Sequence, residues 1–192
     1  MLVYTGNKSF GEAVLKTDDP MLEITIQVAQ ASDVEALLHV AKTTFLETWE
    51  AMNSKEDMDQ YVQQNFTTES IAAEISDPHN RFYLAKAGND WLGYAKLRTS
   101  KIPEQLWQTR CIEIERMYIF KAFKGQNVGS ELMQRCLAYA QENNYETVWL
   151  GVWSENPAVR FYEKWGFHWF GFHTFVLGND QQRDELMKRD LK

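Results

Sequence analysis

The stretch KGQNVGS (124–130) has the composition of an anion-binding turn. Gly125 and Gly129 let a backbone approach a ligand closely, and the apolar spacing that follows predicts a helix. The first turn of a helix presents unpaired N–H groups and the positive end of its dipole, which together bind phosphate. Asn127 stands where a second close glycine would fit best, but asparagine enters left-handed backbone geometry readily. The stretch predicts a phosphate cradle or, as the alternative, a plain structural turn.

Further polar groups lie on both sides of this turn. Glu113 and Glu115 are two residues apart in a predicted strand and therefore share a face, unless they are only solvated strand charges. In ENPAVRFYEKWGF (155–167), Asn156 precedes a short predicted helix and Tyr162 lies on its far turn. The alternative is that Asn156 is a helix cap and that Phe161 and Tyr162 are core aromatics.

Residue periodicity predicts the elements that position these groups. Ser32 and Glu35 form a predicted capping box at the start of a helix. Helical spacing is found at 34–45, 58–62, 71–75 and 132–140, and the short helix lies within 154–167. Strands are predicted at 24–28, 111–120, 147–153, 168–177 and 185–191, with a hairpin over 81–97 that turns at 88–90.

This order, with hairpins before a β-α-β crossover, predicts a mixed α/β fold in a single domain. We assign residues 21–192 to this domain. Residues 1–20 have no clear periodicity and are either an appended arm or an ordinary flexible terminus.

The composition narrows the class of protein. The 192 residues carry a net charge of −7 without a basic stripe, which argues against nucleic-acid binding. No apolar run reaches the ~20 residues of a membrane span, and the N-terminus lacks a signal pattern. Cys111 and Cys136 are expected to be reduced core thiols of a cytoplasmic protein, and the four histidines lack metal-ligand spacing. The aromatic content of 14% suits either a homodimer interface or a core.

Two motifs in order resemble the Gcn5-related N-acetyltransferase (GNAT) superfamily. KGQNVGSxL follows a strand ending RMYI, and NPAVRFYEKWGF follows VWLGV. The likeness extends from about Leu22 to the C-terminus. Lys124 and Asn127 depart from the family's usual loop, which is Arg or Gln, two residues, Gly, one residue, then Gly or Ala. The segments 44–66, 112–118, 148–153 and 173–191 resemble the PaiA-type polyamine acetyltransferases within this superfamily.

The resemblance implies a mostly antiparallel sheet with a β-α-β core that binds acyl-CoA, flanked by helices. It implies acetyl-CoA as co-substrate and no metal. The pantetheine arm is expected beside the backbone of Met117, Tyr118 and Ile119, with Asn156 contacting the same arm. The diphosphate is expected on the backbone of Lys124, Gly125, Gln126, Asn127, Val128, Gly129 and Ser130.

The resemblance also implies a mechanism. An alkylamine has a pKa of roughly 10 and must lose a proton before it attacks a thioester. The family's catalytic glutamate aligns with Glu113, although Glu113 or Glu115 could be the base while the other holds the cationic acceptor. A backbone amide near Tyr118 is expected to stabilise the oxyanion. Tyr162 is expected to be the general acid, with orientation of the substrate as the alternative.

The acceptor implied by the PaiA-like segments is spermidine or spermine. Its pocket is expected between the helical segment 43–66 and the hairpin after Phe167. Charge and aromatic faces could hold a polycation there, with Glu47, Trp49, Glu50 and Tyr61 as candidates. A solvated helix face explains the same acids. The alternative functions are acetylation of a protein lysine or N-terminal amine, and acyl-CoA binding without catalysis.

Overall fold

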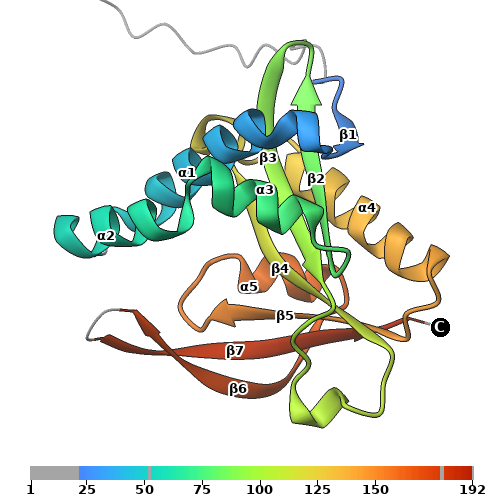
Figure 1. Cartoon of the computed structure of the whole chain (residues 1–192). Coiled ribbons are helices and arrows are strands. Elements are labelled where there is room, and N and C mark those ends of the chain that lie inside the picture. The colour runs from blue at the N-terminus through green and yellow to red at the C-terminus, as the bar shows by residue number, and fades with distance from the viewer. Residues whose placement is uncertain (1–21, 52, 178–179, 192) are drawn as a thin grey trace, which may run out of the picture.

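The computed structural model describes residues 22–51, 53–177 and 180–191 (Figure 1). The predicted arm at 1–20 lies outside these residues. The strands are β1 (Thr25–Val28), β2 (Asn80–Ala87), β3 (Asp90–Arg98), β4 (Cys111–Ile119), β5 (Thr147–Trp153), β6 (His168–Leu177) and β7 (Asp180–Asp190). The helices are α1 (Val34–Trp49), α2 (Lys55–Asn65), α3 (Thr68–Ser76), α4 (Val128–Glu142) and α5 (Val159–Lys164). Short 3-10 turns occupy Ala31–Asp33, Glu104–Leu106 and Lys121–Phe123.

The described strands form one seven-stranded sheet in the order β1-β2-β3-β4-β5-β7-β6. Neighbouring strands are antiparallel except β4 and β5, which are parallel and joined by α4. A parallel pair needs a crossover connection, and α4, which the helical spacing after the KGQNVGS turn predicted, supplies it. The predicted mixed α/β fold with a β-α-β unit is confirmed.

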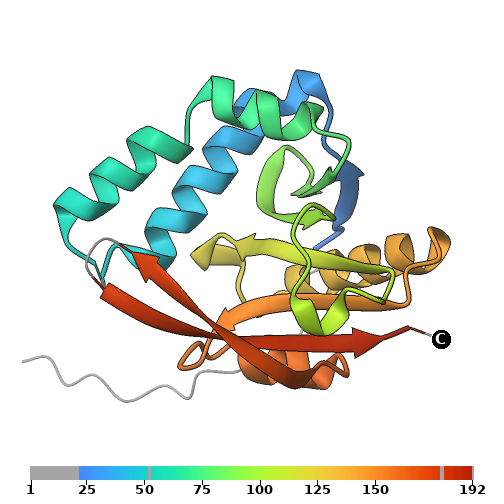
Figure 2. The same cartoon turned by 60° about the horizontal axis from the view of Figure 1, so that its bottom comes forward.

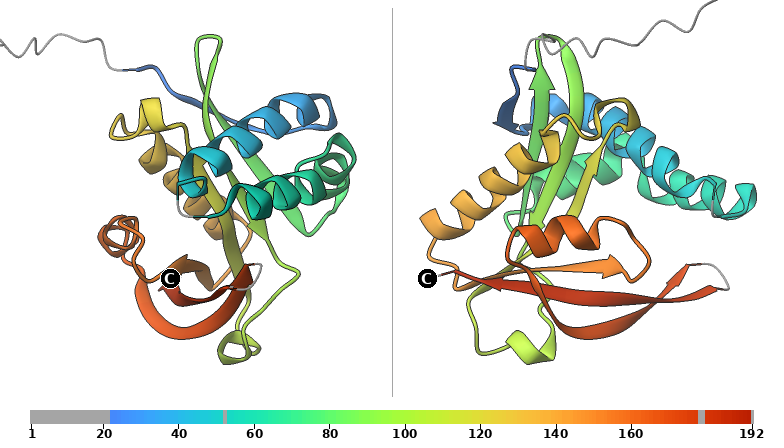
Figure 3. Two further views of the ribbon diagram at one scale, coloured as in Figure 1. Left: turned by 90° about the vertical axis from the view of Figure 1, so that its left-hand side faces the viewer. Right: turned by 180° about the vertical axis from the view of Figure 1, so that it is seen from behind.

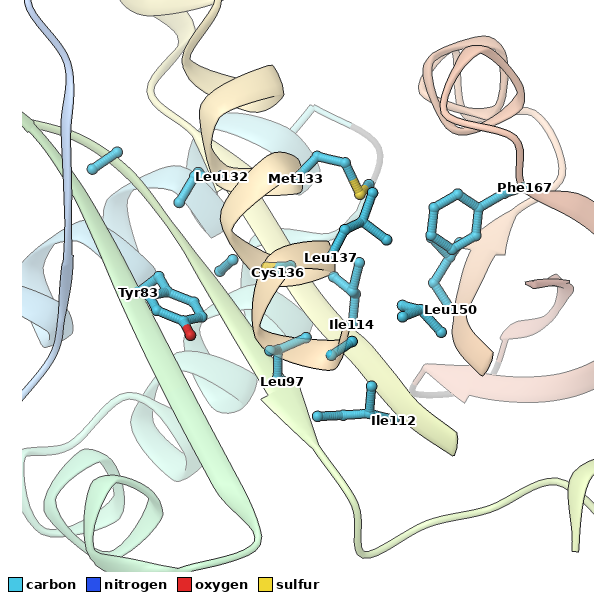
Figure 4. Packing of buried hydrophobic residues seen from close by; sticks show 14 of the residues in the cluster. Tyr83, Leu97, Ile112, Ile114, Leu132, Met133, Cys136, Leu137, Leu150 and Phe167 are labelled. Carbon is cyan, nitrogen blue, oxygen red and sulfur yellow. The ribbon is translucent and has the colours of Figure 1, made fainter. Parts of the chain in front are cut away.

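Helices cover both faces of the sheet. On one face, α1 and α3 pack on β2 and β3, where Leu37, Val40 and Ile71 meet Leu84 and Tyr94 (Figure 1). On the other face, α4 covers β3, β4 and β5, as the view from behind shows (Figure 3). The predicted apolar positions of α4 all point into this core (Figure 4), and they are Leu132, Met133, Cys136, Leu137 and Ala140.

The sheet opens between its two parallel strands. β4 and β5 pair only from Cys111 opposite Thr147 to Glu113 opposite Trp149. Beyond that point β4 stays with β3 and β5 stays with β7, so the two halves of the sheet diverge (Figures 1 and 2). This divergence creates the space in which a ligand can lie between two strands.

A β-bulge accompanies the divergence. Leu97 pairs with Ile114 and Lys96 pairs with Arg116, which leaves Glu115 as the extra residue of β4. A bulge bends its strand and increases the local twist, and here it lies just after β4 loses contact with β5. At the far end of β4, a Cβ on Gly93 would collide with the backbone of Tyr118 and Ile119, so glycine keeps β3 tightly against β4 there.

The predicted capping box at Ser32 and Glu35 is wrong. Ser32 lies inside the 3-10 turn that precedes α1, so the chain turns earlier than its sequence pattern suggested. The backbone N–H of Gln30 instead donates to Oδ2 of Asp33 at 2.8 Å. The next two helices do have side-chain caps, since Ser54 accepts from the N–H of Asp57 and Thr67 from the N–H of Ser70.

Candidate active site

A cavity of about 1170 Å³ occupies the opening between β4 and β5. The turn before α4 lies at one end, and the divergent edges of β4 and β5 form its sides. Further lining residues come from α1, α2, β3, β6 and β7, from the loop at 101–103, and from the segment 156–162. The cavity thus brings together β4, the turn before α4 and the segment after β5, which carry the predicted polar residues. The C-terminal hairpin adds to its lining.

The turn before α4 has the backbone of an anion-binding loop. Asn127 has φ 67° and ψ 0°, the left-handed geometry expected for it, and Gly125 also has positive φ at 81°. The N–H of Glu131 donates to the carbonyl of Asn127 at 3.1 Å, so the amides of residues 128–130 precede the first helical hydrogen bond. Asn127 also donates through Nδ2 to Oε1 of Glu131 at 3.1 Å, which holds the turn.

Not every residue of this loop faces the cavity. Five do so, namely Lys124, Gly125, Asn127, Gly129 and Ser130. Gln126 instead donates through Nε2 to the carbonyl of Ala122 at 3.0 Å, and Val128 is buried in the core. Their side chains therefore stabilise the loop, and only their backbone amides remain as candidate ligand contacts.

Neighbouring side chains limit the size of the residue at position 129. A Cβ at this position would lie 3.4 Å from Cδ1 of Ile119 and 3.6 Å from Cζ of Phe161. These distances leave room for a single methyl group but not for a branched side chain without movement of β4 or α5. The close packing fixes the start of α4 against both neighbouring elements.

The segment Met117–Ile119 also lines the cavity. Its residues pair with β3 on one edge, Met117 with Ala95 and Tyr118 with Tyr94. Because pairing with β5 ends at Glu113, the other edge offers N–H and C=O groups to the cavity. An extended ligand containing amide groups could add to this edge as another strand would.

Asn156 and Tyr162 both line the cavity from the segment after β5. Oδ1 of Asn156 accepts from the N–H of Ala158 at 2.9 Å, which holds the turn before α5, although Ala158 and not Asn156 is the N-cap residue of this helix. The half-buried ring of Tyr162 packs edge-to-face against Phe167, with the ring centroids 6.0 Å apart. Burial raises the pKa of Tyr162, and the neighbouring Tyr118 and Cys136 raise it further, so its hydroxyl stays protonated near neutral pH.

The two strand carboxylates bind one guanidinium. Nε of Arg98 contacts Oε2 of Glu113 at 2.5 Å and its Nη1 contacts Oε1 of Glu115 at 2.6 Å, so the predicted shared face is confirmed. Burial raises the pKa of Glu113 despite the hydrogen bond and charge of Arg98. Burial also acts on Glu115, but the charges of Arg116, Lys96 and Arg98 outweigh it and lower the pKa of this carboxyl.

Glu115 belongs to a larger charge network. Nζ of Lys96, whose side chain is 4% exposed, lies 2.7 Å from Oε2 of Glu115 and 3.0 Å from Oε1 of Glu74. Arg116 donates to both oxygens of Glu74 at 2.9 Å. Together with Arg98 and Glu113, these groups make three anions and three cations that neutralise one another.

The side of the cavity where the sequence predicts the acceptor is aromatic. The predicted Trp49 and Tyr61 both line it, together with Phe45, Phe66, Tyr94, Tyr118 and Trp153. Nε1 of Trp49 donates to the hydroxyl of Tyr118 at 3.3 Å, and the Trp49 and Trp153 rings lie 6.4 Å apart.

Glu47 and Glu50 are not among the residues that line this cavity. Oε2 of Glu47 accepts from the backbone N–H of Lys121 at 2.7 Å, which ties α1 to the turn after β4. Glu50 is exposed just beyond the end of α1. The structure therefore offers no support for these two acids in acceptor binding.

The sequence interpretation missed several cavity residues, among them Arg98 and a pair on the C-terminal hairpin. His173 of β6 and Asp184 of β7 are paired across the hairpin, and Nε2 of His173 lies 3.9 Å from Oδ2 of Asp184. A signal for them existed, because LGND at 177–180 has the composition of a tight hairpin turn. Counting outward from that turn places residue 173 opposite residue 184.

Residues 35–167 match the model of the Acetyltransferase (GNAT) family. The chain belongs to this family. It is 31% identical to an uncharacterized N-acetyltransferase of Lactobacillus delbrueckii subsp. lactis over 169 residues, 86% of this chain and 98% of that protein. An uncharacterized N-acetyltransferase of Mycobacterium tuberculosis is 30% identical over 161 residues, 83% of this chain and 99% of the relative. This GNAT protein is therefore an acetyl-CoA-dependent N-acetyltransferase.

Solved structures of other GNAT proteins have the same fold. The PaiA N-acetyltransferase of Thermoplasma acidophilum, in complex with coenzyme A, superposes with a TM-score of 0.72 at 20% identity, covering 88% of this chain and all of that one. The spermidine/spermine N-acetyltransferase SpeG of Vibrio cholerae superposes with a TM-score of 0.61 at 20% identity, covering 87% and 92%. The fold implied by the motif resemblance is confirmed.

Across residues 22–51, 53–177 and 180–191, no group of three or more His, Cys, Asp or Glu side chains is placed to hold a metal ion. None of the helices within these ranges is long and apolar enough to cross a bilayer.

Proposed function

We propose that the chain transfers acetyl from acetyl-CoA to a primary amine of a small molecule, and that the acceptor is a polyamine such as spermidine or spermine. The transfer is a direct attack of the uncharged amine nitrogen on the thioester carbon. The observation that carries the proposal is one continuous cavity with an anion-binding loop at one end and a buried carboxylate of raised pKa deeper inside.

The residues present fit acetyl-CoA. Lys124 and the free amides at the start of α4 suit a diphosphate, and the open edge of Met117–Ile119 suits the amide groups of pantetheine. Asn156 uses Oδ1 to hold the turn before α5, which leaves its Nδ2 group for the same arm. When bound, the co-substrate supplies the activated acetyl group.

Glu113 is the better supported general base. Its pKa is raised, so it holds a proton more readily than an ordinary glutamate, and it lies in the cavity. The oxygens of Glu115 contact Arg98 and Lys96, and its pKa is lowered. We therefore assign proton removal, through an intervening water, to Glu113, and we assign to Glu115 the placing of Arg98.

Tyr162 is proposed as the general acid toward the departing thiolate. Its raised pKa keeps the proton on the hydroxyl until negative charge develops beside it. A backbone amide close to Tyr118, on the open edge of β4, is proposed to stabilise the oxyanion.

Two observations support a polyamine over other amines. Aromatic faces of α1, α2, β4 and β5 line the acceptor side of the cavity, and such faces attract ammonium groups. Two proteins of the same fold are named PaiA N-acetyltransferase and spermidine/spermine N-acetyltransferase. A lysine or an N-terminal amine of a protein is the alternative acceptor.

An acceptor panel tests this proposal. Purified protein with acetyl-CoA is given spermidine, spermine, aminoglycosides, lysine peptides or peptides with a free N-terminus, and released thiol is measured. Turnover with spermidine or spermine at the highest kcat/KM supports the proposal. Preferential turnover of a peptide would transfer the function to protein acetylation, and preference for an aminoglycoside would remove the polyamine.

A further inference from the structure

Among the side chains that the structure describes, Asp184 is the cavity carboxylate with no lysine or arginine ion pair. The other two, Glu113 and Glu115, belong to the balanced network with Arg98, Lys96 and their partners. Within 4 Å of Asp184, the described part of the chain offers the imidazole of His173 as the single basic group, and this ring is a cation only when protonated. Burial raises the pKa of Asp184 even though the charge of His173 opposes it, so the carboxylate is short of positive charge.

The register of the sheet places Asp184 on the same face as Glu113. Glu113 pairs with Trp149 of β5, and Asp184 pairs with Trp153 of the same strand. Directly paired residues share a face, and 149 and 153 differ by an even number, so both carboxylates project to the acceptor side. Both line the cavity.

The same register gives the spacing of the two carboxylates. Asp184 leans over Gly151, because a Cβ built there would lie 3.9 Å from Oδ2 of Asp184. The carboxyl groups are therefore offset by two to four residues along β5, about 7–13 Å. A small monoamine could reach one of them at a time, whereas an extended chain with two amines could reach both.

Aromatic rings line the cavity that Asp184 also lines. Trp153 is the direct strand partner of Asp184, and its ring lies 6.4 Å from that of Trp49. Trp49 in turn donates to the hydroxyl of Tyr118. Tyr118 and Asp184 both line the cavity. Burial raises the pKa of Tyr118, and the negative charge of Asp184 adds to the increase. A cavity that combines a carboxylate with these aromatic rings is suited to an alkylammonium group.

We propose that Asp184, with Trp49, Tyr118 and Trp153, forms a subsite for the second ammonium group of a linear diamine or polyamine. Asp184 is thus a specificity-determining residue that holds the charged end of the acceptor while the uncharged end reaches the Glu113 region. Gly151 leaves the passage between the two ends open. The inference rests on the proposed function, since it names the chemical class of acceptor for the same cavity.

The test compares Asp184→Asn with Glu185→Gln. Glu185 is the next residue of β7 and points to the opposite face, so its variant removes the same charge without touching the cavity. Each protein is assayed with linear α,ω-diamines of increasing length and with alkyl monoamines of matched length. Losing a hydrogen bond to a charged group costs enough to raise KM about tenfold.

We expect Asp184→Asn to raise KM about tenfold for the long diamines, to leave kcat for them nearly unchanged, and to leave the monoamines unaffected. Glu185→Gln should behave as the wild type with both series. A tenfold loss that is equal for monoamines and diamines would overturn the subsite, as would equal effects of the two variants.

A binding measurement separates this inference from the proposed function. Calorimetric titration of the long diamine into wild type and Asp184→Asn needs no turnover. If the diamine binds wild type about tenfold more tightly than the variant but is not acetylated, the subsite stands and the proposed function fails. If turnover of amines is found but the diamine binds both proteins equally, the function stands and the subsite is overturned. If wild type binds no diamine at all, the subsite is likewise overturned.

Discussion

Glu113 and Glu115 bind the same guanidinium of Arg98 from one face of β4, yet their pKa values shift in opposite directions. The difference arises from what else each carboxylate contacts. Glu113 is buried with Arg98 as its bonded cation, whereas Glu115 is also bound by Lys96 and lies 3.8 Å from Arg116. One strand thus presents a carboxylate that can accept a proton beside one that remains ionised.

The first prediction separates these roles by substitution. Glu113→Gln keeps the shape of the side chain but removes the proton acceptor, so kcat/KM should fall about 10²–10⁴-fold. Binding of acetyl-CoA should be unchanged, because Glu113 lies away from the loop. Initial rates by thiol release and calorimetric titration of acetyl-CoA check the two parts.

Glu115→Gln is the matched variant. It removes a contact of the buried Lys96, so the free energy of unfolding should drop by about 1–3 kcal/mol, as measured by urea denaturation. Its loss of kcat/KM should be much smaller than that of Glu113→Gln. An equal or greater loss of rate in the folded Glu115→Gln protein would transfer the base assignment to Glu115.

The second prediction concerns pH. The raised pKa of Glu113 means that its carboxyl keeps a proton to higher pH than an ordinary glutamate, and a protonated carboxyl cannot act as a base. The rate should therefore fall as pH decreases through this raised pKa, at a pH above the ordinary glutamate range. The pH profile of kcat checks it, with Glu113→Gln expected to lose that limb. Persistence of the same limb in the variant would assign it to another group.

The third prediction concerns the loop before α4. Asn127→Gly should keep or tighten coenzyme A affinity, because glycine adopts positive φ without cost. Asn127→Ala should lower the free energy of unfolding by about 1–2 kcal/mol, because alanine is strained in the left-handed region. Calorimetric titration with coenzyme A and urea unfolding measure the two effects.

Gly129 supplies the companion test of the loop. Gly129→Ala adds one methyl at ordinary contact distance from Ile119 and Phe161 and should still bind coenzyme A. Gly129→Val should abolish binding, because its branches force the start of α4 away from β4. Thermal unfolding shows whether the valine variant is folded. Normal coenzyme A binding by a folded Gly129→Val protein would contradict the role assigned to this loop.

The fourth prediction addresses Tyr162. Removing its hydroxyl with Tyr162→Phe should lower kcat about 10²-fold, since a general acid contributes about 10²–10⁴ and the ring packing on Phe167 is retained. The KM for acetyl-CoA should change little. A matched control is Tyr145→Phe, which removes a hydroxyl from a ring on the α4 side of the molecule, and it should leave kcat unchanged. If KM rises instead while kcat is preserved, Tyr162 orients the substrate and is not the acid.

Much of the fold could be predicted because its determinants are local. The apolar spacing of α4, the alternation of β4 and the left-handed preference of Asn127 are properties of short segments. The bulge at Glu115 was not predicted, because it exists only relative to the register of β3.

The proposed acceptor site was predicted less well, because it depends on contacts between segments that are distant in the sequence. Trp49 and Tyr61 were placed in the cavity, but Glu47 is held by the backbone of Lys121, which is distant in sequence and adjacent in space. Asp184 enters the cavity through strand pairing at the other end of the chain. Whether a carboxylate on a helix or strand can bind a ligand depends on which protein groups the tertiary structure places beside it.

The early separation of β4 from β5 has a consequence for how the protein tolerates change. In the proposed complex, the Met117–Ile119 edge contacts the acyl donor through main-chain groups, which every residue except proline supplies in full. Substitutions along this edge can therefore change the shape of the cavity and the amines that it accepts during evolution. The main-chain groups proposed to bind the acyl donor are retained.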